Sequence, residues 1–396
     1  MPPSWLTKRR ALLLLAGFVF FTAIYVIRIR KDMVDFRVNY QAGARLAAGE
    51  PLYRVEDGHF MFKYLPFSAL VYLPLSLLPL EAAKVIWYVA LVGGAVLVFH
   101  LSKTLTAGEG TASMTLYVFP PLILAKFFLR EMALGQINIL ATLILLGMIG
   151  FLKSTPSAEH LNTKRAGLLW GLATSLKPYA AIFLPYFIVT KRWPALGAGG
   201  AAIVLALLLP TVFYGPSGNL ALLGEWASTL SQSTPTLFLS NDNISLIAFF
   251  MKWTHRQDVS LLLTGVTIGI LAVLVLLVIR AGARSRSPMV LECSLLLTLI
   301  PLVSPLGWDY TLLMSVLAVT LIIKNYSHYS LPWRVVLVVN FCVIALSIYD
   351  LIGRPLYGAF MASSILTINF LIVIGFLVAL RFKGSSSLFA QDTAVH

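Results

Sequence analysis

Acidic side chains are scarce in this chain of 396 residues: Asp and Glu number 16, whereas Lys and Arg number 30. Charged residues make up 12% and hydrophobic residues 59% of the chain, against about 25% and about 45–50% in soluble domains. Such a composition excludes a disordered chain and argues against a soluble globular enzyme. A membrane protein with several spans remains, and its few carboxylates can be considered one by one.

Cysteine is almost absent, which excludes a disulfide scaffold, and neither Cys293 nor Cys342 has a partner at metal-motif or redox-motif spacing. Five of the six histidines lie within the chain without ligand spacing, namely His59, His100, His160, His255 and His328. We therefore expect no structural metal site and no cofactor, while a divalent-metal requirement for catalysis stays open.

Long apolar runs dominate the chain. A membrane-spanning helix needs about 20 mostly apolar residues. Twelve segments qualify approximately: 11–27, 66–80, 83–102, 114–129, 134–152, 166–189, 194–214, 259–279, 289–306, 309–323, 333–349 and 362–381. The pattern predicts an all-α polytopic protein with about twelve transmembrane helices in one integral membrane domain, residues 1–396. No small-residue cleavage site follows the first segment, so we interpret it as an uncleaved span.

The net charge of +14 comes from basic residues at the ends of these runs, which indicates membrane orientation rather than nucleic-acid binding. With the N-terminus inside, most basic loops fall inside, but the loop 153–165 disagrees. Two long segments, 28–65 and 215–258, then lie on the outer face. Long loops often carry function, so we expect the chemistry there.

The segment from Asp35 to Gly49 predicts a surface helix that Gly49 and Pro51 end. Its polar stripe contains Arg37, Gln41 and Arg45, and its apolar stripe contains Phe36, Tyr40, Ala44 and Ala47. By position alone, Asp35 is equally a helix N-cap or a catalytic carboxylate. Asp32 abuts a basic triplet and is better explained as a solvated ion partner.

An ordered set of motifs resembles glycosyltransferase family 87. It comprises Asp35-Phe36 with Tyr40, Gly49-x-Pro51-Leu52-Tyr53, Tyr64-x-Pro66, Leu73-Pro74-Leu75, Gly135-Gln136-Ile137-Asn138, Ala166-Gly167-Leu168-x-x-Gly171-Leu172-Ala173, Lys177-Pro178, Lys191-Arg192-Trp193 and Ser304-Pro305-x-x-Trp308-Asp309. The similarity runs from about residue 35 to 315. One departure is Tyr310, where the family usually has a histidine.

The resemblance implies a GT-C glycosyltransferase that takes a sugar, often mannose, from a polyprenyl-phosphate donor and inverts the anomeric centre. It implies an active site on the outer, periplasmic face of the cytoplasmic membrane. It also makes Asp35, in the first outer loop, the expected catalytic base. The expected partners are the donor, a glycolipid or glycan acceptor and membrane lipids, with no nucleic acid.

A departing phosphate needs cations, and Arg37, Arg45 and Lys63 lie in the first outer loop. Lys177 lies inside an apolar segment, beside Pro178, which is expected to break the helix. An intramembrane lysine is costly and is usually functional, so we expect Lys177 to bind the donor phosphate. Arg130 and Glu131 are expected to pair with each other.

The remaining polar candidates are assigned to sugar or acceptor binding: Tyr40, Tyr64, Gln136, Asn138, Asn243, Trp308 and Asp309. Gln136 and Asn138 equally suit hydrogen bonds between helices. For Asn243 and Asp242 the sequence favours a helix cap for at least one of the two, and Asp309 is a second candidate base or metal ligand that ranks below Asp35. Trp226, Trp253 and Trp308 suit either sugar stacking or interface anchoring.

The alternative function is a multi-span transporter or flippase, since about twelve spans with broken helices also describe secondary carriers. Carriers tend to have internal repeats and short outer loops, whereas this chain has no convincing repeat and two long loops. The sequence therefore favours the enzyme.

Overall fold

The named secondary-structure elements of the described part of the chain are all helices. The computed structural model describes residues 16–17, 19–106, 114–153, 159–281 and 288–383. Within these ranges, the one pairing of extended backbone is an isolated bridge between Asn243 and Trp308. The elements are η1 (Tyr25–Ile29), α2 (Val34–Ala48), η2 (Val55–Phe60), α3 (Pro66–Ser76), α4 (Leu80–Thr106), α5 (Thr115–Leu134), α6 (Asn138–Lys153), α7 (Glu159–Leu176), η4 (Pro178–Ile182), α8 (Phe183–Val189), α9 (Trp193–Leu208), α10 (Thr211–Ser233), η5 (Pro235–Leu237), α11 (Leu246–Thr254), α12 (Gln257–Arg280), α13 (Pro288–Val303), η6 (Asp309–Ser315), α14 (Val316–Lys324), η7 (Tyr326–His328), α15 (Leu331–Leu346), α16 (Tyr349–Ile352), α17 (Arg354–Ala362) and α18 (Ile365–Lys383).

The apolar helices make this an integral membrane protein of the predicted all-α class. Among the described residues, α4, α12 and α18 are each long and apolar enough to cross a membrane alone. Helices α9 and α10 qualify as a bent pair, with an angle of 93° between them. The predicted segment 11–27 lies mostly outside the described residues, and the other eleven coincide with one helix or with consecutive helical pieces. The segment 166–189 breaks at Lys177, as Pro178 predicts.

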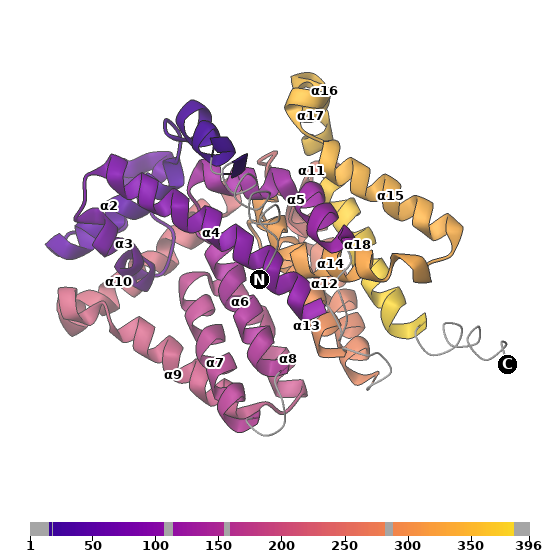
Figure 1. Ribbon diagram of the computed structural model, residues 1–396. Helices are drawn as coiled ribbons and strands as arrows, with labels where there is room; N and C mark the ends of the chain where they lie inside the picture. The colour runs from indigo at the N-terminus through magenta and orange to yellow at the C-terminus, as the bar shows by residue number, and fades with distance from the viewer. Residues whose placement is uncertain (1–15, 18, 107–113, 154–158, 282–287, 384–396) are drawn as a thin grey trace, which may run out of the picture.

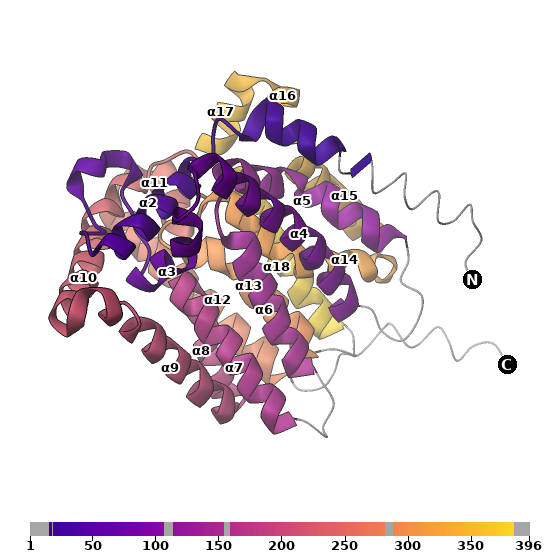
Figure 2. The ribbon, with the colours of Figure 1, turned by 60° about the vertical axis from the view of Figure 1, so that its left-hand side comes forward.

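Helices α6, α7 and α9 run alongside one another, while α2 lies against α3 at the opposite end of the molecule (Figures 1 and 2). The two segments predicted as outer loops contact each other at that end. The indole of Trp226 in the second segment donates to the carbonyl of Lys63 in the first at 3.3 Å. Tyr214, which directly precedes the second segment, donates through its hydroxyl to the carbonyl of Glu50 at 2.6 Å. These contacts bring residues far apart in sequence to one side of the fold.

Helix α2 forms where the sequence predicts it and ends at Gly49, whose φ is +67°. The predicted N-cap role of Asp35 is wrong, because Met33 holds that position and Asp35 lies in the first turn. The predicted apolar stripe is confirmed for Phe36 and for Tyr40, which is half-buried against the core, but it is wrong for Ala44 and Ala47, which are exposed. The face that packs inward is Phe36, Asn39, Ala42, Gly43 and Leu46. The small residues in the middle of that face let α2 lie close against α3, which a count of apolar side chains misses.

Helices α7 and α9 approach closely because glycines replace side chains at their contact. A Cβ built on Gly167 stands 2.6 Å from the Cα of Ala195 and closer still to its carbonyl oxygen. We expect Gly167→Ala to lower the free energy of unfolding by about 1–3 kcal/mol through overpacking. Thermal unfolding in detergent measures this. Gly197→Ala on α9 is the matched control, since a Cβ there meets nothing within 4 Å, and equal losses would contradict the packing account.

Candidate functional site

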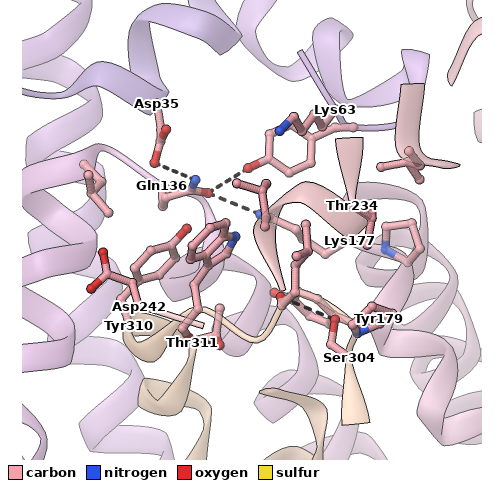
Figure 3. A pocket seen from close by; sticks show the side chains of 18 of the residues that line it. Asp35, Lys63, Gln136, Lys177, Tyr179, Thr234, Asp242, Ser304, Tyr310 and Thr311 are labelled. Atoms are coloured by element: carbon pink, nitrogen blue, oxygen red, sulfur yellow. Dashed lines mark hydrogen bonds between the residues drawn. The ribbon is translucent and has the colours of Figure 1, made fainter. Parts of the chain in front are cut away.

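A cavity of about 710 Å³ lies where α2, the α5–α6 turn, the break at Lys177 and the second long segment meet. Its walls combine a few charged groups with aromatic rings, as small-molecule sites usually do. Asp35, Lys63, Gln136 and Lys177 lie on the side of the cavity shown at the top of Figure 3, and Asp242 and Tyr310 lie below them. The cavity is thus built from segments that are distant in sequence.

The turn between α5 and α6 presents Gln136 to the cavity. Helix α5 ends at Gly135, which has φ +72°, and its carbonyl accepts a hydrogen bond from the indole of Trp87 at 2.8 Å. A Cβ on Gly135 would lie 2.6 Å from the Cβ of Phe36. A glycine at this position therefore allows both the left-handed turn and the close approach of α2.

Gln136 joins three elements through its side-chain amide. Its Nε2 donates to Oδ2 of Asp35 at 2.8 Å (Figure 3). Its Oε1 accepts from the hydroxyl of Tyr64 at 3.0 Å and from Nζ of Lys177 at 3.2 Å. Because both donors lie on the oxygen side, the amide nitrogen must face the Asp35 carboxylate.

Lys177 lies at the break between α7 and η4, and it is 8% exposed. Its ammonium is 4.1 Å from the centre of the Tyr64 ring, close enough for a cation–π contact. The predicted helix break at Pro178 is confirmed. Because the backbone of Lys177 is extended rather than helical, its ammonium reaches the cavity wall.

Lys63 is half-buried on the same wall as Asp35. Burial holds the pKa of the Lys63 ammonium below its usual range, and the nearby negative charge of Asp35 offsets only part of this lowering. The cavity therefore places two lysines near one carboxylate, an arrangement suited to an anionic ligand whose reaction requires a base.

Glu131 lies beneath this turn and is fully buried. Its carboxylate accepts from the backbone N–H of Asn138 at 2.5 Å and from that of Ile139 at 3.3 Å. It also accepts from the Asn138 amide at 2.8 Å. The acid thus satisfies free N–H groups at the start of α6, where a negative charge is favourable. The predicted pairing of Arg130 with Glu131 is wrong, because adjacent helical residues point to different sides.

Replacing Glu131 with glutamine is expected to lower the free energy of unfolding by about 1–3 kcal/mol, since the amide presents a donor to buried N–H groups. Chemical or thermal unfolding of the purified protein measures the loss. Glu159→Gln, in the exposed first turn of α7, is the matched control. If both variants unfold alike, the capping role of Glu131 is refuted.

Arg130 pairs instead with two aspartates from other parts of the chain. Its NH1 donates to Asp309 at 2.7 Å and its NH2 to Asp242 at 2.6 Å. The guanidinium thereby ties α5 to the second long segment and to the start of η6. Asp309 is buried and does not line the cavity, whereas Arg130 and Asp242 do.

The second long segment is held against the start of η6. The bridge between Asn243 and Trp308 is extended by a bond from the N–H of Ile244 to the Gly307 carbonyl at 2.7 Å. The predicted cap at Asp242 or Asn243 is wrong. Ser245 caps α11 by accepting from the N–H of Ala248, while the Asn243 carboxamide binds the N–H of Gly307 at 3.1 Å.

Half of the residues predicted for the site line the cavity: Asp35, Lys63, Tyr64, Gln136, Lys177 and Trp308. The others do not: Arg37, Tyr40, Arg45, Asn138, Asn243 and Asp309. Arg45 forms an ion pair with Asp57 at 2.5 Å, and this bond holds the pKa of the Asp57 carboxyl below its usual range. Tyr40 donates to the Leu78 carbonyl at 2.7 Å.

Several cavity residues had not been predicted for the site, notably Arg130, Tyr179 and Tyr310. The Tyr179 hydroxyl donates to Oδ1 of Asn138 at 2.8 Å, which connects the cavity wall to the buried Glu131. Tyr310, which the sequence singled out only as a departure from the expected motif, also lies on the wall. Nothing local distinguishes Arg130 and Tyr179 from packing residues. Within the described ranges, no three His, Cys, Asp or Glu side chains come together to hold a metal ion.

Comparison with known proteins gives three similarities. The profile of glycosyltransferase family 87 matches residues 62–305, more than half of the chain, beginning after α2 and Asp35. A polyprenol-phosphate-mannose-dependent alpha-(1-2)-phosphatidylinositol pentamannoside mannosyltransferase of Mycolicibacterium smegmatis is 26% identical over 310 residues, covering 72% of this chain and 68% of that protein. The structure of ArnT from Cupriavidus metallidurans bound to undecaprenyl phosphate covers 92% of this chain and 77% of its own, with 12% identity and a TM-score of 0.37.

Proposed function

The chain belongs to glycosyltransferase family 87, and on this premise we propose that it transfers mannose from a polyprenyl-phosphate donor to a lipid-linked or glycan acceptor. The name of the Mycolicibacterium relative supports the donor and the sugar. The observation that carries the proposal is the group of Asp35, Gln136 and Lys177 on the wall of one cavity. It combines a base with a cation for the phosphate.

In the proposed reaction, an acceptor hydroxyl oxygen attacks the anomeric carbon of mannose from the face opposite the phosphate. The bond between that carbon and the phosphate oxygen breaks, so the anomeric centre is inverted. Asp35 takes the hydroxyl proton, and polyprenyl phosphate leaves with the bonding electron pair. One carboxylate suffices because phosphate needs no protonation to leave, unlike the alkoxide in most glycoside hydrolyses.

Gln136 is proposed to orient the base. Its amide is fixed by Tyr64 and Lys177 on one side, so its N–H holds one oxygen of Asp35 in place. A held carboxylate loses less entropy when the acceptor binds. This role places Gln136 beside the acceptor, which is consistent with its assignment from the sequence to sugar or acceptor binding.

Lys177 and Lys63 are proposed to bind the donor phosphate. Both line the cavity, and both lie near Asp35, so the phosphate and the base can meet at one anomeric carbon. As the glycosidic bond breaks, the phosphate gains negative charge, and a partly buried cation stabilises that change more than water does. The aromatic walls at Tyr64, Trp226 and Trp308 suit the apolar faces of a sugar ring.

The test uses the full chain in proteoliposomes with radiolabelled polyprenyl-phosphate mannose and a lipid extract as acceptor source. A new glycosidic bond in the extracted lipids is expected, with release of polyprenyl phosphate. Supplying the donor on one face at a time determines whether the reaction occurs on the proposed outer face. Transfer of label across the bilayer without any new bond would instead identify a carrier and reject the enzyme.

A further inference from the structure

The guanidinium of Arg130 is held unequally by its two carboxylate partners. The side chain of Asp309 is 4% exposed, whereas that of Asp242 is 38% exposed and that of Arg130 is 30% exposed. Arg130 and Asp242 both line the cavity, while Asp309 lies behind them. One arm of the guanidinium is therefore anchored in the protein, and the other meets a carboxylate that a ligand in the cavity can reach.

We propose that Arg130 is a further anion-binding residue of the cavity, and that the phosphate group of a lipid-linked ligand replaces Asp242 on its exposed arm. A phosphate ester offers oxygens in the same geometry as a carboxylate, which suits the fork of an arginine. The exchange substitutes one charge-assisted hydrogen bond for another and keeps the bond to Asp309. The inference deepens the proposed function, since polyprenyl phosphate is the ligand it names.

The backbone around Asp242 is fixed, so the exchange needs only a side-chain rotation. The carbonyl of Asp242 accepts from the N–H of Asp309 at 3.0 Å. Lys252 donates to the carbonyls of Asn241 and Asn243, at 3.0 and 2.8 Å. A partly exposed carboxylate on such a backbone can move between staggered rotamers without disturbing the loop. Asp242 can then return to Arg130 when the phosphate leaves.

Arg130 also supplies a phosphate-binding cation, a role for which the sequence had suggested other residues. Arg37 and Arg45 were expected to bind the phosphate, but neither lines the cavity. Lys177 already shares its ammonium with Gln136. A leaving phosphate that gains charge is stabilised further by Arg130, a third cation beside Lys177 and Lys63, which α5 contributes to the cavity.

The test measures binding of a short-chain polyprenyl phosphate to the purified full chain by calorimetry. Asp242→Asn frees the exposed arm of Arg130, so the Kd is expected to fall about two- to fivefold, as for loss of a competing partly exposed ion pair. Glu56→Gln is the matched control, since it removes the same charge from an exposed position in η2 that does not line the cavity. An unchanged or higher Kd for Asp242→Asn would overturn the proposal.

Two further ligands distinguish the source of the anion. The neutral short-chain polyprenol should bind both proteins equally, and inorganic phosphate should show no gain at the same concentration. A gain in affinity for polyprenol, or an equal gain for inorganic phosphate, would overturn the assignment to a lipid phosphate.

The double variant Arg130→Gln with Asp309→Asn removes the cation without leaving the buried carboxylate of Asp309 unpaired, and it should raise the Kd for the short-chain polyprenyl phosphate about tenfold. Because no transfer step is measured, failure of mannosyl transfer in the wild type would reject the proposed function separately.

Discussion

Replacing Asp35 with asparagine is expected to lower kcat/KM for mannosyl transfer by about 10²–10⁴-fold, the usual contribution of a positioned general base. The substitution keeps the size of the side chain, and the asparagine carbonyl can still accept from Nε2 of Gln136. The cavity wall therefore stays intact while the proton acceptor is lost. The measurement is the initial rate of transfer from radiolabelled polyprenyl-phosphate mannose, together with the Kd for polyprenyl phosphate, which should not change.

The control for Asp35→Asn is Asp32→Asn, which removes the same charge three positions earlier. Asp32 is exposed and does not line the cavity, so its loss should leave transfer unaffected. The pH dependence adds a second readout. The wild-type rate should fall at acidic pH as the base becomes protonated, whereas the residual rate of Asp35→Asn should lack that limb. Full transfer by Asp35→Asn would remove Asp35 from the mechanism.

Replacing Lys177 with methionine is expected to raise the Kd for polyprenyl phosphate about tenfold or more, since a buried cation is then missing from a charge-assisted contact. The acceptor KM should change much less. Methionine fills a similar volume, but it leaves Oε1 of Gln136 with Tyr64 as its remaining donor. We therefore also expect a loss in kcat, because the orientation of Gln136 toward Asp35 is less restricted.

Lys164→Met provides the comparison for Lys177→Met, since Lys164 is an exposed lysine on the preceding helix, α7. It should bind polyprenyl phosphate as the wild type does. Thermal unfolding of both variants separates a folding defect from a binding defect. If Lys177→Met weakened acceptor affinity more than donor affinity, the phosphate role would be refuted.

Features of the fold that depend only on residues close together in the sequence were predicted from it. The apolar runs predicted where helices lie, because a helix with a buried face shows its apolar residues within a few turns of chain. Pro178 predicted the break at Lys177, and Gly49 predicted the end of α2, because proline and glycine act on their own backbone. The membrane class followed from composition alone.

The partners of the charged side chains were decided by the tertiary structure. Asp35 meets Gln136 across 101 positions, and Arg130 meets Asp242 and Asp309 across 112 and 179 positions. In an apolar protein, a charged side chain pairs with whichever opposite charge the packing brings within hydrogen-bond distance. Proximity in sequence was therefore a poor guide, and the predicted pairing of Arg130 with Glu131 was wrong. The sequence thus determined a helical membrane protein with few carboxylates, and only the packing of its helices decided which of those carboxylates faces the cavity.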